Sequence, residues 1–135
     1  MGRMIFDSSV WVEFLNKTDF HLGHLLRKRL MANEDVFICP PIVQEVLQGI
    51  KNEGLFNEIQ DLFSSLEQLP AFNYISAIEA AKLYRSLRKK GTTIRKPNDC
   101  LIAWYAIHHE LTLVHNDRDF DLIAEHTPLK TFQPG

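Results

Sequence analysis

The sequence has 135 residues, 45% of them hydrophobic and 24% charged, which is the composition of one globular domain over residues 1–135 with a core of its own. Its 15 basic and 17 acidic side chains give a formal net charge of −2, so no overall positive charge indicates a nucleic-acid partner. No apolar run approaches the roughly 20 residues of a membrane span, and two cysteines are too few for a disulfide framework. We therefore expect a cytoplasmic protein without a membrane partner.

Short apolar strands alternate with amphipathic helices along the N-terminal half of the chain. Proline suits the first turn of a helix, where its missing N–H costs nothing, so Pro40 and Pro41 mark a helix start. After Asn52, leucine and isoleucine recur every three or four residues, the spacing of one helix face. The expected elements are a strand over Arg3–Asp7, a helix over Val10–Asn16 capped by Ser8 or Ser9, a helix over Phe20–Asn33, a strand over Val36–Cys39, a helix from Pro40 to about Gly49, and a helix over Asn52–Leu69.

The C-terminal half continues the alternation. The expected elements are a helix over Ile75–Lys90 ended by Gly91, a helix over Asp99–Glu110 capped by Asn98, a strand over Leu111–Val114, a helical turn or two over Phe120–Glu125, and a short strand over Lys130–Gln133. Because the strands are short, apolar and separated by helices, we expect an α/β domain whose central, mostly parallel sheet is flanked by helices.

Carboxylates are expected at one edge of this sheet, where parallel strands end and ligands bind. Asp7 closes the first strand, Glu45 lies early in the helix after the second, and Asp117 comes shortly after the third. Asp99 sits in the first turn of its helix, and Asp119 lies just beyond Asp117. Each acid alone is typical of a turn or a helix terminus. Together they would repel one another unless a cation lay among them, and carboxylates without paired His or Cys suit Mg²⁺ or Mn²⁺.

A basic stretch leads directly to Asp99. The segment Lys82–Lys96 holds seven of the 15 basic residues and no acid. Taken alone, it is either the solvated face and C-terminal end of a helix or a site for phosphate groups. Its position favours phosphate binding, because its charge would lie beside the predicted metal pocket.

Four segments resemble, in order and at suitable intervals, the motifs of PIN-domain ribonucleases and, among them, the VapC-type toxins of toxin–antitoxin pairs. They are MIFDSSVWVEFL, PPIVQEVLQGI, NDCLIAWYAIHHELTLV and HNDRDFDLIAE, and they extend from about Met4 to Glu125. The resemblance implies a single PIN-like domain and a Mg²⁺- or Mn²⁺-dependent endoribonuclease that cleaves RNA phosphodiester bonds with metal-activated water. It also implies a homodimer, a cognate antitoxin that blocks the site, and a structured RNA substrate such as tRNA or ribosomal RNA.

The resemblance places catalysis and metal binding on the same four residues, Asp7, Glu45, Asp99 and Asp117. We expect Asp7 and Asp99 to be the principal metal ligands, with Asp117 completing the cation site. Glu45 is expected to hold a second ion or to orient the attacking water. The RNA backbone is expected to follow the basic residues Arg88, Lys89, Lys90, Arg95 and Lys96.

Three further residues are expected to support the pocket. Asp119 is an accessory acid, and Ser9 is a polar neighbour that orients a carboxylate or a water on the metal. Many relatives carry Thr or Ser where this chain has His115, so an imidazole replaces a hydroxyl there. That imidazole is expected either to bond a neighbouring carboxylate or to meet the substrate phosphate.

Two other functions fit parts of the pattern. A receiver-like signalling module also gathers acids around Mg²⁺ and needs a late lysine such as Lys130, but no Asp ends a strand between Asp7 and Asp117. A non-catalytic interaction protein would keep the PIN fold, and the four acids argue against it. An exposed remainder of the Leu55–Leu69 stripe would suit a dimer or antitoxin surface.

Overall fold

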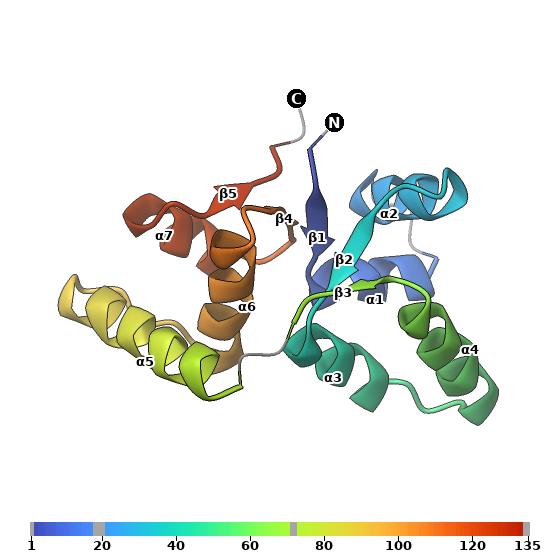
Figure 1. The fold of residues 1–135 in the computed structure, drawn as a ribbon, viewed down its shortest axis with the longest axis horizontal. Coiled ribbons are helices and arrows are strands. Elements are labelled where there is room, and N and C mark those ends of the chain that lie inside the picture. Colours follow the sequence, from blue (N-terminus) through green and yellow to red (C-terminus); the bar gives the residue numbers. More distant parts are fainter. Residues whose placement is uncertain (1, 18–20, 71–72, 134–135) are drawn as a thin grey trace.

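Five short strands form one sheet in which every neighbouring pair runs parallel, which confirms the expected α/β architecture (Figure 1). The computed structural model describes residues 2–17, 21–70 and 73–133. The strands are β1 (Met4–Phe6), β2 (Val36–Ile38), β3 (Glu67–Gln68), β4 (Thr112–Val114) and β5 (Lys130–Thr131). Their order across the sheet is β3-β2-β1-β4-β5, so the chain builds out from β1 first to one side and then to the other.

Seven helices surround the sheet in the described part of the chain. They are α1 (Ser8–Leu15), α2 (His21–Met31), α3 (Pro40–Gln48), α4 (Glu53–Ser64), α5 (Asn73–Lys89), α6 (Pro97–His108) and α7 (Arg118–His126). In Figure 1, α2 and α4 lie toward one end of the molecule and α5 and α7 toward the other. None of these helices is long and apolar enough to cross a membrane.

The central strands β1, β2 and β4 are largely buried, whereas β3 at the sheet edge is exposed. Ile5 and Phe6 of β1 and Leu113 of β4 are fully buried, as are Trp11 of α1 and Ile102 of α6. Burying a side chain of this size contributes about 1.5–3 kcal/mol. Because strand order reverses at β1, the carboxyl ends of β2, β1 and β4 lie side by side and form the crevice where parallel sheets bind ligands.

The expected helix over Asn52–Leu69 is wrong at its C-terminal end. Asn52 does cap the helix, with its side chain accepting a hydrogen bond from the Leu55 N–H at 2.8 Å. The helix α4 then ends at Ser64, and β3 follows at the sheet edge. The Leu69 N–H donates to the carbonyl oxygen of Ile38 at 2.9 Å. The apolar spacing runs on past the helix because Leu66 and Leu69, on either side of the exposed strand β3, pack against the core.

Two expected helix caps also differ from the structure. Asp7, and neither Ser8 nor Ser9, caps α1. At the start of α6 the N-cap is Lys96, and Pro97 is the first helical residue, so Asn98 lies inside the first turn. The Asn98 side chain is thereby available to contact Glu45 of α3. Phe20, the expected first residue of the second helix, lies outside the described residues.

Candidate active site and metal centre

Asp7 stands at the junction of β1 and α1. Its backbone N–H donates to the Val114 carbonyl at 2.9 Å and fastens the end of β1 to β4. Its Oδ2 accepts hydrogen bonds from the Ser9 N–H at 3.1 Å and the Ser9 hydroxyl at 2.7 Å, which makes Ser9 a direct neighbour of this carboxylate. Its Oδ1 is buried without a hydrogen-bond partner among the described residues. Burial raises the pKa of Asp7 and the negative charge of Glu45 adds to this, while the Ser9 bonds oppose it.

Asp99 lies in the first turn of α6 and is only 2% exposed. Its Oδ2 likewise finds no hydrogen-bond partner in the described structure. Burial raises the pKa of Asp99 to about 7, and the negative charges of nearby acids add to that effect, while Lys96 works against it. Two carboxyl groups of the edge, those of Asp7 and Asp99, are therefore held in surroundings that disfavour their ionised form.

Glu45 is held at both carboxylate oxygens by residues that the sequence did not single out for this role. Its Oε1 accepts from the Ser8 hydroxyl at 2.8 Å, and its Oε2 accepts from the Asn98 side-chain amide at 3.3 Å. Ser8 begins α1 and Asn98 lies in the first turn of α6. Residues of these two helices therefore fix the orientation of the Glu45 carboxylate, which belongs to α3. The only sequence signal for the Ser8–Glu45 contact was that Ser8 is adjacent to Asp7.

Asp117 and Asp119 lie at the start of α7 and are engaged by cations. Asp117 caps the helix, and its Oδ1 accepts the Asp119 N–H at 3.0 Å. Arg95 contacts both acids, through Nη2 to Asp117 at 3.3 Å and through Nε to Asp119 at 3.2 Å, and Lys96 Nζ lies 3.2 Å from Asp117. Although burial opposes ionisation, the Asp119 N–H and these two cations hold the pKa of Asp117 below its usual range.

His115 also contacts the turn that carries Asp117. Its Nδ1 accepts the Asp117 N–H at 3.1 Å, and its Nε2 lies 3.3 Å from the Asp121 carboxylate. Its ring packs at 5.2 Å from that of Phe120. The structure therefore places this imidazole against a backbone amide and the carboxylate of Asp121, where it helps to shape the turn that carries Asp117.

Three of the five acids expected at the sheet edge form a close cluster, and the other two lie near enough for their charges to act on it. One carboxylate oxygen from each of Asp99, Asp117 and Asp119 lies within 4.8 Å of the other two, and the charges of Asp7 and Glu45 reach Asp99 strongly enough to raise its pKa. A divalent cation fits this arrangement. The donors are hard oxygens, and Asp7 and Asp99 each present a buried oxygen that no hydrogen bond satisfies among the described residues.

The basic stretch divides into two groups. Arg95 and Lys96 are the cations paired with the acids, so a metal ion that used Asp117 would have to share it with them or displace them. Arg88 and Lys89 end α5 and Lys90 follows, and all three are exposed. Lys89 and Lys90 line a shallow basic hollow of about 370 Å³ together with Lys82 and Arg85 of the same helix.

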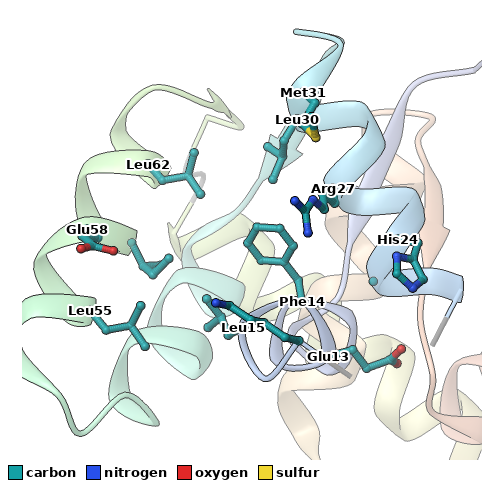
Figure 2. A pocket seen from close by; sticks show the side chains of 13 residues that line it. Glu13, Phe14, Leu15, His24, Arg27, Leu30, Met31, Leu55, Glu58 and Leu62 are labelled. Carbon is teal, nitrogen blue, oxygen red and sulfur yellow. The ribbon is translucent and has the colours of Figure 1, made fainter. Parts of the chain in front are cut away.

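A large hollow lies away from the acids of the sheet edge, between α1, α2 and α4 (Figure 2). This groove has a volume of about 640 Å³. Phe14 projects toward its centre from α1, and Leu55 and Leu62 face it from α4. Part of the Leu55–Leu69 stripe is thus left at a surface. Exposed apolar area of this kind is typical of interaction sites.

Three comparisons with known proteins agree with this geometry. The family model of the PIN domain matches residues 4–126. The chain is 36% identical over 129 residues to ribonuclease VapC11 of Mycobacterium tuberculosis and equally to a VapC ribonuclease of Mycobacterium bovis, with 94% of this chain and 96% of each relative covered. Solved structures with the same fold include VapBC2 of Rickettsia felis bound to promoter DNA, at 24% identity and a TM-score of 0.73, covering 96% of each chain. Another is DNA-bound VapBC of Salmonella typhimurium, at 22% identity and a TM-score of 0.75, covering 98% of each chain.

The parallel sheet with acids at its carboxyl edge, together with the matched family model, defines the class as that of PIN-domain nucleases, which use divalent metal ions. Within that class, the chain belongs to the VapC family of ribonucleases. This membership favours a nuclease over the receiver-like module that the sequence also left open.

Proposed function

We propose that this protein is the toxin of a type II toxin–antitoxin pair and cleaves RNA as a metal-dependent endoribonuclease at Asp7, Glu45, Asp99 and Asp117. The observation that carries the proposal is the pair of buried, unsatisfied carboxylate oxygens on Asp7 and Asp99, which point to a cation among the acids. The name ribonuclease, borne by relatives 36% identical over nearly the whole chain, supports RNA as the substrate.

The residues divide the chemical work between them. A bound Mg²⁺, or Mn²⁺ in its place, would supply the Lewis acidity that activates water and the positive charge that meets the scissile phosphate. Asp7 and Asp99 would hold this ion as its principal ligands, and Asp117 would complete the site. Glu45, aimed by Ser8 and Asn98, orients the attacking water. We propose Mg²⁺ as the bound ion. Mn²⁺ takes the same oxygen ligands and therefore serves as a probe for it in binding experiments.

Arg95 and Lys96 are proposed to guide the RNA backbone into the site, with Arg88, Lys89 and Lys90 extending the path along α5. Asp119 accepts both the backbone N–H and the Nε of Arg95, at 3.3 and 3.2 Å, and so holds the guanidinium beside the pocket. This role of the cations would be contradicted by RNA binding that is unchanged, in affinity and salt dependence, when Arg95 and Arg88 are both replaced by glutamine.

The decisive experiment compares RNA cleavage by the purified parent chain with cleavage by Asp7→Asn and Asp99→Asn. Each variant keeps the side-chain volume and removes a charged metal ligand, so we expect at least a 100-fold loss of Mg²⁺-dependent cleavage with an unchanged circular dichroism spectrum. Asp61→Asn, at an exposed acid of α4, is the matched control and should cut normally. Retained cleavage in either site variant would defeat the assignment.

Expression of the chain in a bacterium tests the substrate and the toxin role together. We propose a structured RNA such as tRNA or ribosomal RNA, cut in the cytoplasm. Growth arrest with the parent and not with Asp7→Asn, with new ends that map to such an RNA, is the expected result. Arrest by both proteins, or no new RNA ends, would contradict it.

Two protein partners belong to the proposal. The neighbours in the solved structures are complexes named VapBC, which supports a cognate antitoxin, and we place it in the groove between α1, α2 and α4. We also propose a homodimer. Exposed Tyr74 and Ile75 on α5, at 78% and 57% exposure, offer an apolar surface for it. A monomeric mass by light scattering at micromolar concentration would exclude the dimer.

A further inference from the structure

Asn116, in the turn between β4 and α7, makes two hydrogen bonds to residues of α1. Its backbone N–H donates to Ser9 Oγ at 3.0 Å, and its side-chain amide donates to Glu13 Oε2 at 3.2 Å. Ser9 and Glu13 are four residues apart in α1, so they lie one turn apart on the same face of the helix. The contacts join segments that are more than a hundred positions apart in the chain.

Glu13 is an unusual residue for its place in α1. It is only 7% exposed, and the other buried residues of this helix, Val10 and Trp11, are apolar. Burying a carboxylate costs free energy, and hydrogen bonds offset only part of that cost. An apolar side chain would fill the position with less penalty if packing were its only role. The contact with the turn is one polar interaction that a carboxylate at this position makes and an apolar side chain would lose.

The two ends of the Asn116–Ser9 hydrogen bond lie next to acids of the candidate site. The Ser9 hydroxyl that accepts from Asn116 itself donates to Asp7 Oδ2 at 2.7 Å. The residue that follows Asn116 is Asp117, whose carboxylate caps α7. A continuous set of hydrogen bonds thus links the Asp7 side of the acid cluster, carried by β1 and α1, to the Asp117 side, carried by the turn after β4.

We propose that Glu13 and Asn116 are positioning residues that set the separation of Asp7 and Asp117, and through it the geometry of the metal site. This inference rests on the proposed function, and it adds two residues that touch neither metal nor RNA. Residues that orient metal ligands in this way commonly change metal affinity by 10-fold to 100-fold when they are removed.

The test measures Mn²⁺ binding by calorimetry on the purified full chain after removal of metal with EDTA. Asn116→Ala and Glu13→Ala each remove one partner, and we expect each to weaken Mn²⁺ binding about 10-fold. The double variant should be no weaker than either single one, because both substitutions break the same contact. Glu13→Gln keeps an acceptor for the Asn116 amide and should restore binding to within about 3-fold of the parent. Asn57→Ala, at an exposed asparagine of α4, is the control.

Kinetics and hydrogen exchange separate positioning from mere stability and from failure of the proposed function. With saturating Mn²⁺, the Ala variants should show a lower kcat for RNA cleavage at a similar KM. In metal-free protein, the backbone amides of residues 116–119 should exchange at least 5-fold faster in Asn116→Ala. This exchange measurement stands even if the parent chain cuts no RNA or binds no Mn²⁺.

Three results would overturn the inference. They are parent-like Mn²⁺ affinity in both Ala variants, additive losses in the double variant, or unchanged exchange at the turn. If an Ala variant fails to fold, Asn116→Asp keeps the side-chain volume and sets a second carboxylate against Glu13. That variant must then show the same loss of Mn²⁺ affinity, and parent-like binding by it would also reject the proposal.

Discussion

Asp99 is a residue whose proton affects the stability of the metal-free molecule. Its pKa is raised to about 7 in the folded state, mainly by burial, against an ordinary value of 3.8. Between these two values the folded state keeps a proton that the unfolded state has lost. The stabilisation from this proton is complete below about pH 4 and disappears as the pH rises through 7. A divalent ion reverses the preference, because it binds the ionised carboxylate.

The first prediction concerns this titration. In EDTA, Asp99→Asn should be more stable than the parent at pH 8, by at most about 4 kcal/mol, and nearly equal to it at pH 4. Urea denaturation at pH 4, 6 and 8 measures the difference. Asp61→Asn controls for the loss of one exposed acid and should follow the parent at each pH. A difference between Asp99→Asn and the parent that is the same at all three pH values would show that Asp99 has no raised pKa.

Other residues of the site take roles that depend on distant partners. Asp119 was expected as an accessory acid, and in the structure it holds Arg95 through two hydrogen bonds. Ser8 was considered only as a helix cap, and it instead bonds Glu45 at a sequence distance of 37. Residue types and spacing identified the acids, while the partners of each acid depend on how the helices meet.

Among the elements, α4 shows how an apolar stripe can serve both the core and a surface. Ile59 and Phe63 are buried, whereas Leu55 and Leu62 are half-buried and face the groove with Phe14 (Figure 2). The helix carries none of the acids at the sheet edge. A change on the α4 side of the groove should therefore affect a partner and leave the site itself intact.

The second prediction follows from this separation. Leu62→Lys sets a charge in the groove and should abolish neutralisation by the cognate antitoxin, while the purified variant still cuts RNA at the parent rate. Growth of cells that co-express toxin and antitoxin reports neutralisation. Gln60→Lys adds the same charge at an exposed position of α4 outside the groove and should leave neutralisation intact. Equal neutralisation of both variants would place the antitoxin elsewhere.

For the whole molecule, a cation bound among the acids would join elements that come from distant parts of the chain. Asp7 follows β1, Glu45 lies in α3, Asp99 lies in the first turn of α6 and Asp117 caps α7. An ion that binds only the folded arrangement stabilises it by about 2.7 kcal/mol at 100 times its dissociation constant. For a domain of this size, that corresponds to a rise in Tm of roughly 10 °C.

The third prediction is that Mg²⁺ raises the Tm of the parent by this amount and that of Asp7→Asn by much less. Scanning calorimetry with and without Mg²⁺ measures both shifts. Residues 1–135 are proposed to form one domain, so each scan should also show a single transition. Equal shifts in the two proteins would mean that Mg²⁺ binds elsewhere, and two transitions would divide the chain into separate units.

Local patterns in the sequence were sufficient for the alternation of strands and helices and for the acids at the sheet edge. Buried parallel strands are continuous apolar runs, and their carboxyl ends share one edge, so position along the chain predicts position in space. The same patterns missed β3, because its pairing with β2 depends on contacts such as that between the Leu69 N–H and the Ile38 carbonyl. Periodicity describes one segment and holds no information about its neighbours.

Only the assembled fold decided which side chains hold the acids. Ser8 and Asn98 on Glu45, Arg95 on Asp119, and Asn116 on Glu13 are contacts between elements far apart in sequence. The raised pKa of Asp99 likewise arises from burial and from charges on other elements. Such contacts depend on the crossing of α1, α3, α6 and the turn before α7 over one sheet edge, and no local sequence signal encodes that crossing.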